Sequence, residues 1–99
     1  MRIYIIHSSN DTEQYLERIK MTEERLIEYG HHVLNPLPEG VEHFSNEDFF
    51  KLYASKINLC DIVYVMLDWE NSDISHYELE EAVALKKGIM FEKPIGVTS

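Results

Sequence analysis

Hydrophobic residues follow two different patterns along this chain, short unbroken runs and longer stretches with helical spacing. The unbroken runs cover residues 2–7, 32–34, 62–67 and 89–91, and their β-branched residues are typical of strands buried on both faces. Apolar residues three and four apart cover residues 12–29, 46–58 and about 73–87, which predicts three amphipathic helices. Strands that alternate with helices predict one three-layer α/β/α domain over residues 1–99. We expect a flavodoxin/Rossmann-like parallel sheet of four to five strands in the order 2-1-3-4.

The helical spacing also predicts which residues face the core. In the first helix the inward stripe is Tyr15, Ile19, Thr22, Leu26 and Tyr29. In the second helix, which follows a cap at residues 45–48, it is Phe49, Phe50, Tyr53 and Ile57.

The predicted strand order places a ligand crevice between the carboxyl ends of the first and third strands. The loops that follow them, residues 7–12 and 68–72, then face each other. Ser8, Asn71 and Ser72 belong to these loops, where hydroxyls and helix N-termini can hold a phosphate, although small polar residues are also ordinary in turns. His7 and His76 are either surface residues or cationic contacts to that phosphate. A further residue, Trp69, is either a platform for a base or a hydrophobic anchor.

One acidic residue, Glu78, lies in the first turn of the third predicted helix. It precedes Ala82 by four residues and Leu85 by seven, so its carboxylate shares the apolar stripe. Two interpretations are open. Ser75 and Glu78 fit a capping box, in which the glutamate bonds back to the helix backbone. Alternatively, the carboxylate is turned into the crevice and carries the chemistry.

The charge of the chain excludes several partners. A formal charge of −9 without a basic stripe argues against nucleic-acid polymers and disfavours anionic membranes. No apolar run is long enough to cross a bilayer, and we expect no signal peptide. The single cysteine, Cys60, cannot form an internal disulfide, and we expect it to be a small core residue in a cytoplasmic protein.

The sequence predicts neither a metal nor a cofactor. His31 and His32 are adjacent and point to opposite faces of a strand, and no H-x-x-x-H or C-x-x-C pair exists. The glycine patterns G-x-G-x-x-G and G-x-x-x-x-G-K-[ST] are also absent, which argues against a standard dinucleotide fold or a P-loop.

A family resemblance rests on four stretches: residues 60–72 (CDIVYVMLDWENS), 77–82 (YELEEA), 3–5 (IYI) and 26–36 (LIEYGHHVLNP). Their order and spacing resemble the nucleoside 2-deoxyribosyltransferase-like superfamily, and within it the short DUF4406-type branch. The resemblance covers nearly the whole chain. It implies a homo-oligomer, with the aromatic second helix as a candidate contact.

The resemblance also implies a mechanism. A carboxylate attacks the anomeric carbon of a 2-deoxyribosyl group, releases the base, and passes the sugar to another base or to water. Glu78 matches the nucleophile of that family, and Tyr4 matches the tyrosine beside it. Ser8 and Ser72 match the serines that hold a 5′-phosphate in the nucleotide-hydrolysing members.

Three positions depart from the family pattern. Tyr53 stands where the family has a catalytic Asp, and Asp48 lies about one and a half turns earlier on the helix. His7 and Ile74 stand where the family has glycines that let backbone approach the ligand.

The residues and the resemblance together lead to three alternative functions. The first is N-glycosidic cleavage or deoxyribosyl transfer on a nucleoside or nucleoside 5′-monophosphate, with His76 or Asp68 as candidate proton donors to the base. The second is a catalytically inert nucleotide-binding or regulatory module, which Tyr53 favours. The third is NAD cleavage as in Toll/interleukin-receptor domains, which residues 8–11 and 77–82 resemble.

Overall fold

The protein was analysed as a computed structural model, which describes residues 1–8, 12–34 and 41–93. Four strands form one parallel sheet: β1 (Arg2–Ile6), β2 (His32–Val33), β3 (Ile62–Val65) and β4 (Gly88–Phe91). Three α-helices connect them: α1 (Glu13–Glu28), α2 (Asn46–Leu59) and α3 (Asp73–Ala84). Two 3-10 turns, η1 (Val41–His43) and η2 (Trp69–Asn71), precede α2 and α3.

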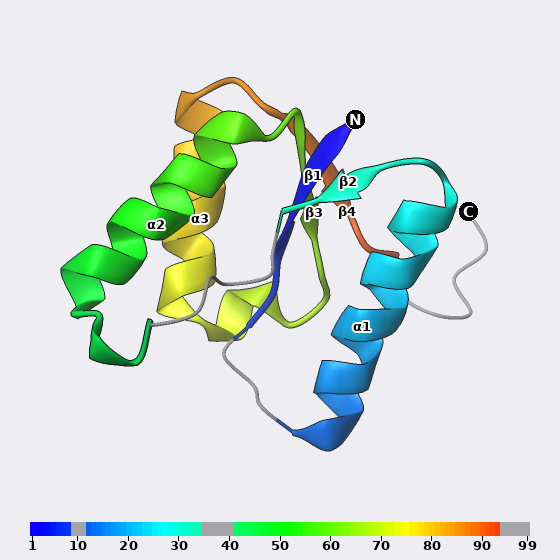
Figure 1. The fold of residues 1–99 in the computed structure, drawn as a ribbon, viewed down its shortest axis with the longest axis horizontal. Coiled ribbons are helices and arrows are strands. Elements are labelled where there is room, and N and C mark those ends of the chain that lie inside the picture. Colours follow the sequence, from blue (N-terminus) through cyan, green and yellow to red (C-terminus); the bar gives the residue numbers. More distant parts are fainter. Residues whose placement is uncertain (9–11, 35–40, 94–99) are drawn as a thin grey trace.

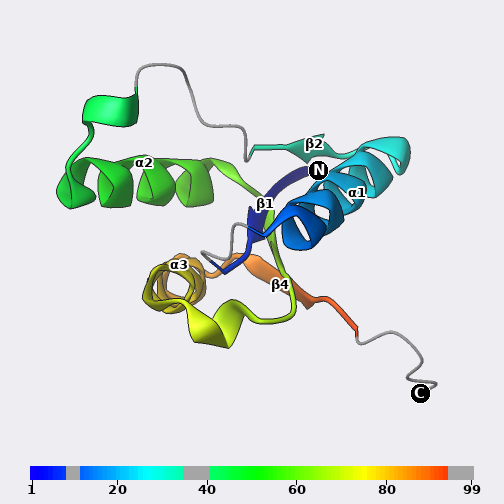
Figure 2. The same ribbon diagram turned by 90° about the horizontal axis from the view of Figure 1, so that it is seen from below.

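The strand order is β2-β1-β3-β4, as the sequence predicts. The register pairs Tyr4 with Val63 and Ile6 with Val65, so the carboxyl ends of β1 and β3 lie side by side. In Figure 1 the sheet stands between α1 on one side and α2 with α3 on the other, and Figure 2 shows the same three layers from below. The predicted α/β class and layer arrangement are confirmed.

Strand β1 supplies the core on both faces of the sheet. Tyr4 and Ile6 belong to the buried cluster under α2 and α3. Ile3 and Ile5 alternate with them and belong to the cluster under α1. This alternation follows from the two-residue period of a strand, and it turns the Tyr4 side chain toward α3.

The inward stripes were predicted correctly for most positions. Tyr15 and Leu26 are buried on α1, and Ile57 is buried on α2. Two aromatic residues were predicted wrongly. Tyr29 is 74 % exposed, because α1 ends at Glu28 and the chain leaves the helical stripe there. Phe50 is 37 % exposed and contacts Tyr77, with ring centroids 4.8 Å apart.

Helix α3 begins earlier than a Ser75–Glu78 capping box requires. Its first residue is Asp73 and its N-cap position is Ser72, so Ser75 already lies in the first turn. The Ser75 hydroxyl donates instead to the His7 carbonyl oxygen, at 2.7 Å. The capping-box interpretation of Glu78 is therefore wrong, and its carboxylate has a different partner.

The carboxyl ends of β1 and β3 are joined by one tyrosine of α1. The Ser8 N–H donates to Tyr15 Oη at 3.0 Å, and the Tyr15 hydroxyl donates to the Leu67 carbonyl oxygen at 3.3 Å. These bonds satisfy backbone groups beyond the last ladder pair of the two strands. No helix within the described ranges is long and apolar enough to span a bilayer.

Candidate functional site

Buried polar side chains gather where α3 faces the end of β1. Ser72, Ser75 and Glu78 are spaced by three residues, so they follow one side of α3. Each is at most 6 % exposed, and Ser8, just beyond β1, is 4 % exposed. Because buried polar groups are costly unless they are hydrogen-bonded, such a group of side chains needs specific partners.

The partner of Glu78 is Tyr4. The Tyr4 hydroxyl donates a hydrogen bond to Glu78 Oε2, and this bond joins the first strand to the third helix, 74 residues apart in the chain. Tyr4 is 4 % exposed, as is Glu78. The phenol therefore holds the carboxylate in a fixed position inside the protein.

Burial changes the acidity of this pair. Loss of hydration raises the pKa of Glu78 from its ordinary 4.5 to about 7, and the hydrogen bond from Tyr4 opposes the rise by favouring the carboxylate. The pKa of Tyr4 is raised as well, first by burial and then by the adjacent Glu78 charge. Near neutral pH the site thus holds a neutral phenol beside a carboxyl group that is partly ionised.

A second phenol, Tyr53 of α2, belongs to the same region. Tyr53 packs half-buried against the cluster that contains Tyr4, and its ring stacks on Phe49 with centroids 6.0 Å apart. Burial and the Glu78 carboxylate both raise its pKa. The position at which the resemblance implies an aspartate is thus occupied by a neutral aromatic side chain near the carboxylate.

The two histidines expected at the crevice rim contact groups other than the Glu78 carboxylate. The His7 Nδ1 lies 2.9 Å from the Ser8 carbonyl oxygen, and its ring meets the edge of Tyr15 on the α1 side. His76 is exposed, and its Nε2 lies 2.9 Å from the Glu70 carbonyl oxygen. Both rings are therefore engaged by neighbouring groups of their own loops and helices.

Trp69 and Asn71 belong to η2, at the outer side of α3. The Trp69 ring contacts His76 at 4.7 Å and Phe91 at 6.4 Å between centroids, and it packs on the edge of the core. This packing agrees with the hydrophobic-anchor interpretation of Trp69. Trp69 and His76 also line a surface cavity of about 460 Å³ with residues of α3. Asn71 is exposed.

Asp68, the other candidate proton donor, is exposed and has a left-handed backbone with φ of 71°. It lines a small cavity of about 200 Å³ with Tyr15 and Arg18 of α1. Within residues 1–8, 12–34 and 41–93, no three His, Cys, Asp or Glu side chains come together as a metal site.

Sequence reasoning missed the part played by Tyr15. The periodicity correctly assigned its ring to the core, but the hydroxyl is what connects Ser8 to Leu67. A buried tyrosine needs a partner for its hydroxyl, and this was the available signal. The partner itself depends on how the strand ends meet, which only the tertiary structure shows.

Comparison with known proteins places this geometry in a class. The sheet order, the family match and the likeness to a solved structure together define a Rossmann-like α/β protein of the nucleoside 2-deoxyribosyltransferase-like superfamily. The chain belongs to the DUF4406 family, whose model, described as a domain of unknown function, matches residues 1–91. No curated protein matches the sequence.

A solved structure with the same fold is that of the Clostridium botulinum CMP N-glycosidase BcmB. The two chains share 25 % sequence identity with a TM-score of 0.73. The match covers 92 % of this chain and 67 % of the other.

Proposed function

We propose that this protein cleaves the N-glycosidic bond of a nucleoside or nucleoside 5′-monophosphate, with Glu78 as the nucleophile. The observation that carries the proposal is the buried hydrogen bond from Tyr4 to Glu78. A carboxylate kept from water and held by a neutral phenol is poised to react with a bound sugar, which a capping or surface glutamate is not. The likeness to a CMP N-glycosidase supports the same reaction class.

The proposed reaction has two steps. A Glu78 carboxylate oxygen forms a bond to the anomeric carbon while the bond from that carbon to the base nitrogen breaks, and the electron pair leaves with the base. Water, or a second base, then attacks the anomeric carbon, loses its proton to solvent and releases the carboxylate. The negative charge of Glu78 also stabilises the oxocarbenium-like transition states of both steps.

Tyr4 has a positioning role in this mechanism. Its hydroxyl donates to Oε2 of the Glu78 carboxylate. The other oxygen, Oε1, is then the one that attacks the anomeric carbon. It also lowers the pKa of Glu78 against the effect of burial, so more of the nucleophile is ionised at neutral pH. Neither His76 nor Asp68 hydrogen-bonds to Glu78 among the described contacts, and we assign the proton on the departing base to solvent.

We assign the 5′-phosphate of the substrate to Ser8 and Ser72. Ser72 occupies the N-cap position of α3, where backbone N–H groups and the helix dipole favour an anion. Ser8 follows β1 at the same end of the sheet. A phosphate there would set the sugar along the line from Ser72 to Glu78.

Release of free base from a panel of nucleosides and 5′-monophosphates, in ribo and deoxy forms, tests the proposal by chromatography. Wild type should release base from at least one compound, and Glu78→Gln should lose at least about a thousandfold in rate, since the nucleophile is gone. Glu80→Gln is the matched control, because Glu80 is exposed two residues further along α3. Equal release by wild type and Glu78→Gln would refute the assignment.

The second candidate is a catalytically inert nucleotide-binding module, and Tyr53 is the observation that favours it. A phenol with a raised pKa cannot replace a carboxylate as acid or base near neutral pH. Calorimetric binding of a nucleotide without base release from any compound would support this candidate over the first. NAD belongs in the same panel, because its consumption would instead support a Toll/interleukin-receptor-like activity.

A further inference from the structure

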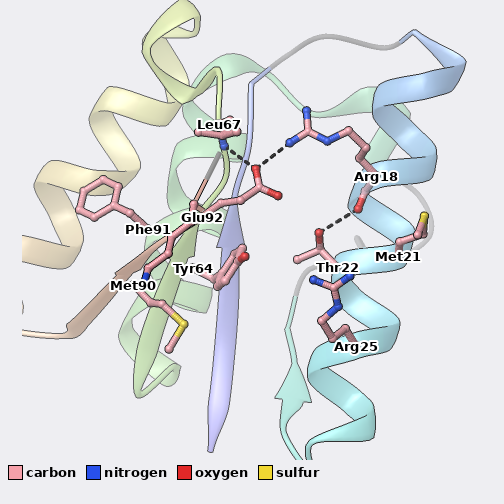
Figure 3. Close-up of a pocket in the computed structure, with 10 residues that line it drawn as sticks. Arg18, Met21, Thr22, Arg25, Tyr64, Leu67, Met90, Phe91 and Glu92 are labelled. Carbon is pink, nitrogen blue, oxygen red and sulfur yellow. Dashed lines mark hydrogen bonds and ion pairs between the residues drawn. The ribbon is translucent and has the colours of Figure 1, made fainter. Parts of the chain in front are cut away.

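A groove runs along the opposite face of the sheet from Glu78, between α1 and the paired strands β3 and β4. Its volume is about 440 Å³, which is within the range of small-molecule sites. Figure 3 shows side chains from α1 and from the two strands pointing toward each other across it. The lining residues are Arg18, Met21, Thr22, Arg25, Tyr64, Leu67, Met90, Phe91, Glu92 and Lys93.

The charge of this groove differs from that of the protein. The chain carries a formal charge of −9, whereas the groove is lined by three cations, Arg18, Arg25 and Lys93, and one carboxylate, Glu92. The cations exceed the carboxylate by two. An acidic protein that gathers positive charge around one cavity favours an anion there over the surrounding surface.

One end of the groove is held by an ion pair. Arg18 Nη2 donates to Glu92 Oε1 at 2.7 Å, and the same oxygen accepts the Leu67 N–H at 2.8 Å (Figure 3). Thr22 donates to the Arg18 carbonyl oxygen within α1. Glu92 is thus neutralised by Arg18 and fixed to the end of β3, and it does not need the other cations.

The opposite end carries donors without a partner. The Arg25 guanidinium forms no hydrogen bond or ion pair with another described residue, although it lines the groove beside Tyr64. The Tyr64 hydroxyl likewise has no hydrogen bond to a described residue. The Tyr64 ring and the Met90 side chain supply an apolar surface in the groove.

We propose that this groove binds an aromatic phosphate monoester. The phosphate dianion matches the two excess positive charges of the lining, and the planar guanidinium of Arg25 can bind two of its oxygens. The flat ring lies against Tyr64 and Met90, since thioethers and aromatic rings pack well together. The site is independent of Glu78, because it lies on the α1 face of the sheet.

Titration of the full chain with 1-naphthyl phosphate, followed by amide chemical shifts, tests this site. This probe has no glycosidic bond and so cannot be a substrate of Glu78. We expect shifts at Arg25, Tyr64 and Met90, and affinity that falls as salt rises. Inorganic phosphate and 1-naphthol, the two halves of the probe, should each bind more weakly than the whole.

Two single-charge variants make the test specific. Arg25→Gln should weaken binding about tenfold or more, as expected for loss of a charge-assisted hydrogen bond. Lys20→Gln removes the same charge from an exposed site of α1 that does not line the groove, and should change affinity little. The proposal would be overturned if both variants lost affinity equally or if the probe did not bind. Amide shifts confined to α3 and Ser8 would overturn it as well.

Discussion

A carboxylate that is removed from water is an unusual use of a glutamate, because the charged form loses much of its hydration energy. Glu78 is nevertheless buried, and its carboxylate accepts a hydrogen bond from one phenol, that of Tyr4. Burial of Glu78 and its contact with Tyr4 therefore connect the stability of the fold to the proposed chemistry, and both depend on pH.

The stability of the fold should fall as pH rises through the titration of Glu78. Its pKa is about 7 in the folded protein and 4.5 ordinarily, so the folded state binds the extra proton between these values. Stability from this group is complete below pH 4.5 and is lost as pH approaches 7. Glu78→Gln stays neutral, so above pH 7 it should be more stable than wild type by about 3 kcal/mol.

Urea unfolding of both proteins from pH 4 to pH 8 measures this difference. The two curves should converge at acid pH and separate between pH 5 and 7. If the difference in unfolding free energy between the two proteins were the same at all pH values, the pKa of Glu78 would not be raised by folding. That result would contradict the prediction.

Tyr4→Phe tests the phenol by a change in pH dependence. Without the donor, the pKa of Glu78 should rise further, because that hydrogen bond favours the charged form. The acid limb of kcat/KM should therefore move to higher pH by about one to two units, as expected for a hydrogen bond to a charged group. A lower rate with an unmoved limb would mean that Tyr4 acts only through packing.

At the scale of elements, helix α3 shows where sequence reasoning succeeded and where it failed. Its spacing placed Glu78 on the apolar stripe, and the structure buries that residue. The starting residue was ambiguous, because Ser72 and Ser75 are both good cap residues. The choice depends on the His7 carbonyl, which takes the Ser75 hydroxyl. That group belongs to the loop directly after β1, so no local pattern within α3 could reveal it.

Ser75→Ala should destabilise the protein by about 1–3 kcal/mol, because the His7 carbonyl loses its buried partner. It should also reduce the proposed activity, since Ser75 bonds the first turn of α3 to the residue after β1 and Glu78 lies one turn further along. Thermal unfolding with Ser55→Ala as an exposed control on α2 checks the first effect. Similar melting temperatures for the two variants would contradict it.

At the scale of the whole molecule, the alternation of strands and helices was enough to predict the sheet order and the layers. Long-range tertiary contacts were out of reach for the same approach. One example is the Tyr15 hydroxyl, which accepts a hydrogen bond from Ser8 and donates one to Leu67. Another is the ion pair of Arg18 with Glu92. Each joins residues whose spacing carries no periodic signal, so the groove on the α1 face was not foreseen.

We also propose that the chain self-associates. Strand β4 is an edge strand with all four residues exposed, and Ile89, Met90 and Phe91 are apolar. Exposed apolar edges of this kind pair readily with another strand. Sedimentation should give a mass of at least two 11.7-kDa chains, and Ile89→Lys should reduce it to one. A single-chain mass for the unmodified protein at its highest soluble concentration would contradict the proposal.

The central claim is that the Glu78 carboxylate bonds to a sugar, and intact-protein mass spectrometry tests it most directly. The protein is incubated with the nucleotide panel, including 2-fluoro sugars that slow release of the intermediate. We predict a mass gain equal to the sugar of a nucleoside, or to the sugar 5′-phosphate of a monophosphate, mapped by peptide analysis to Glu78 and absent in Glu78→Gln. Base release without any adduct, or with an adduct on another residue, would contradict the account.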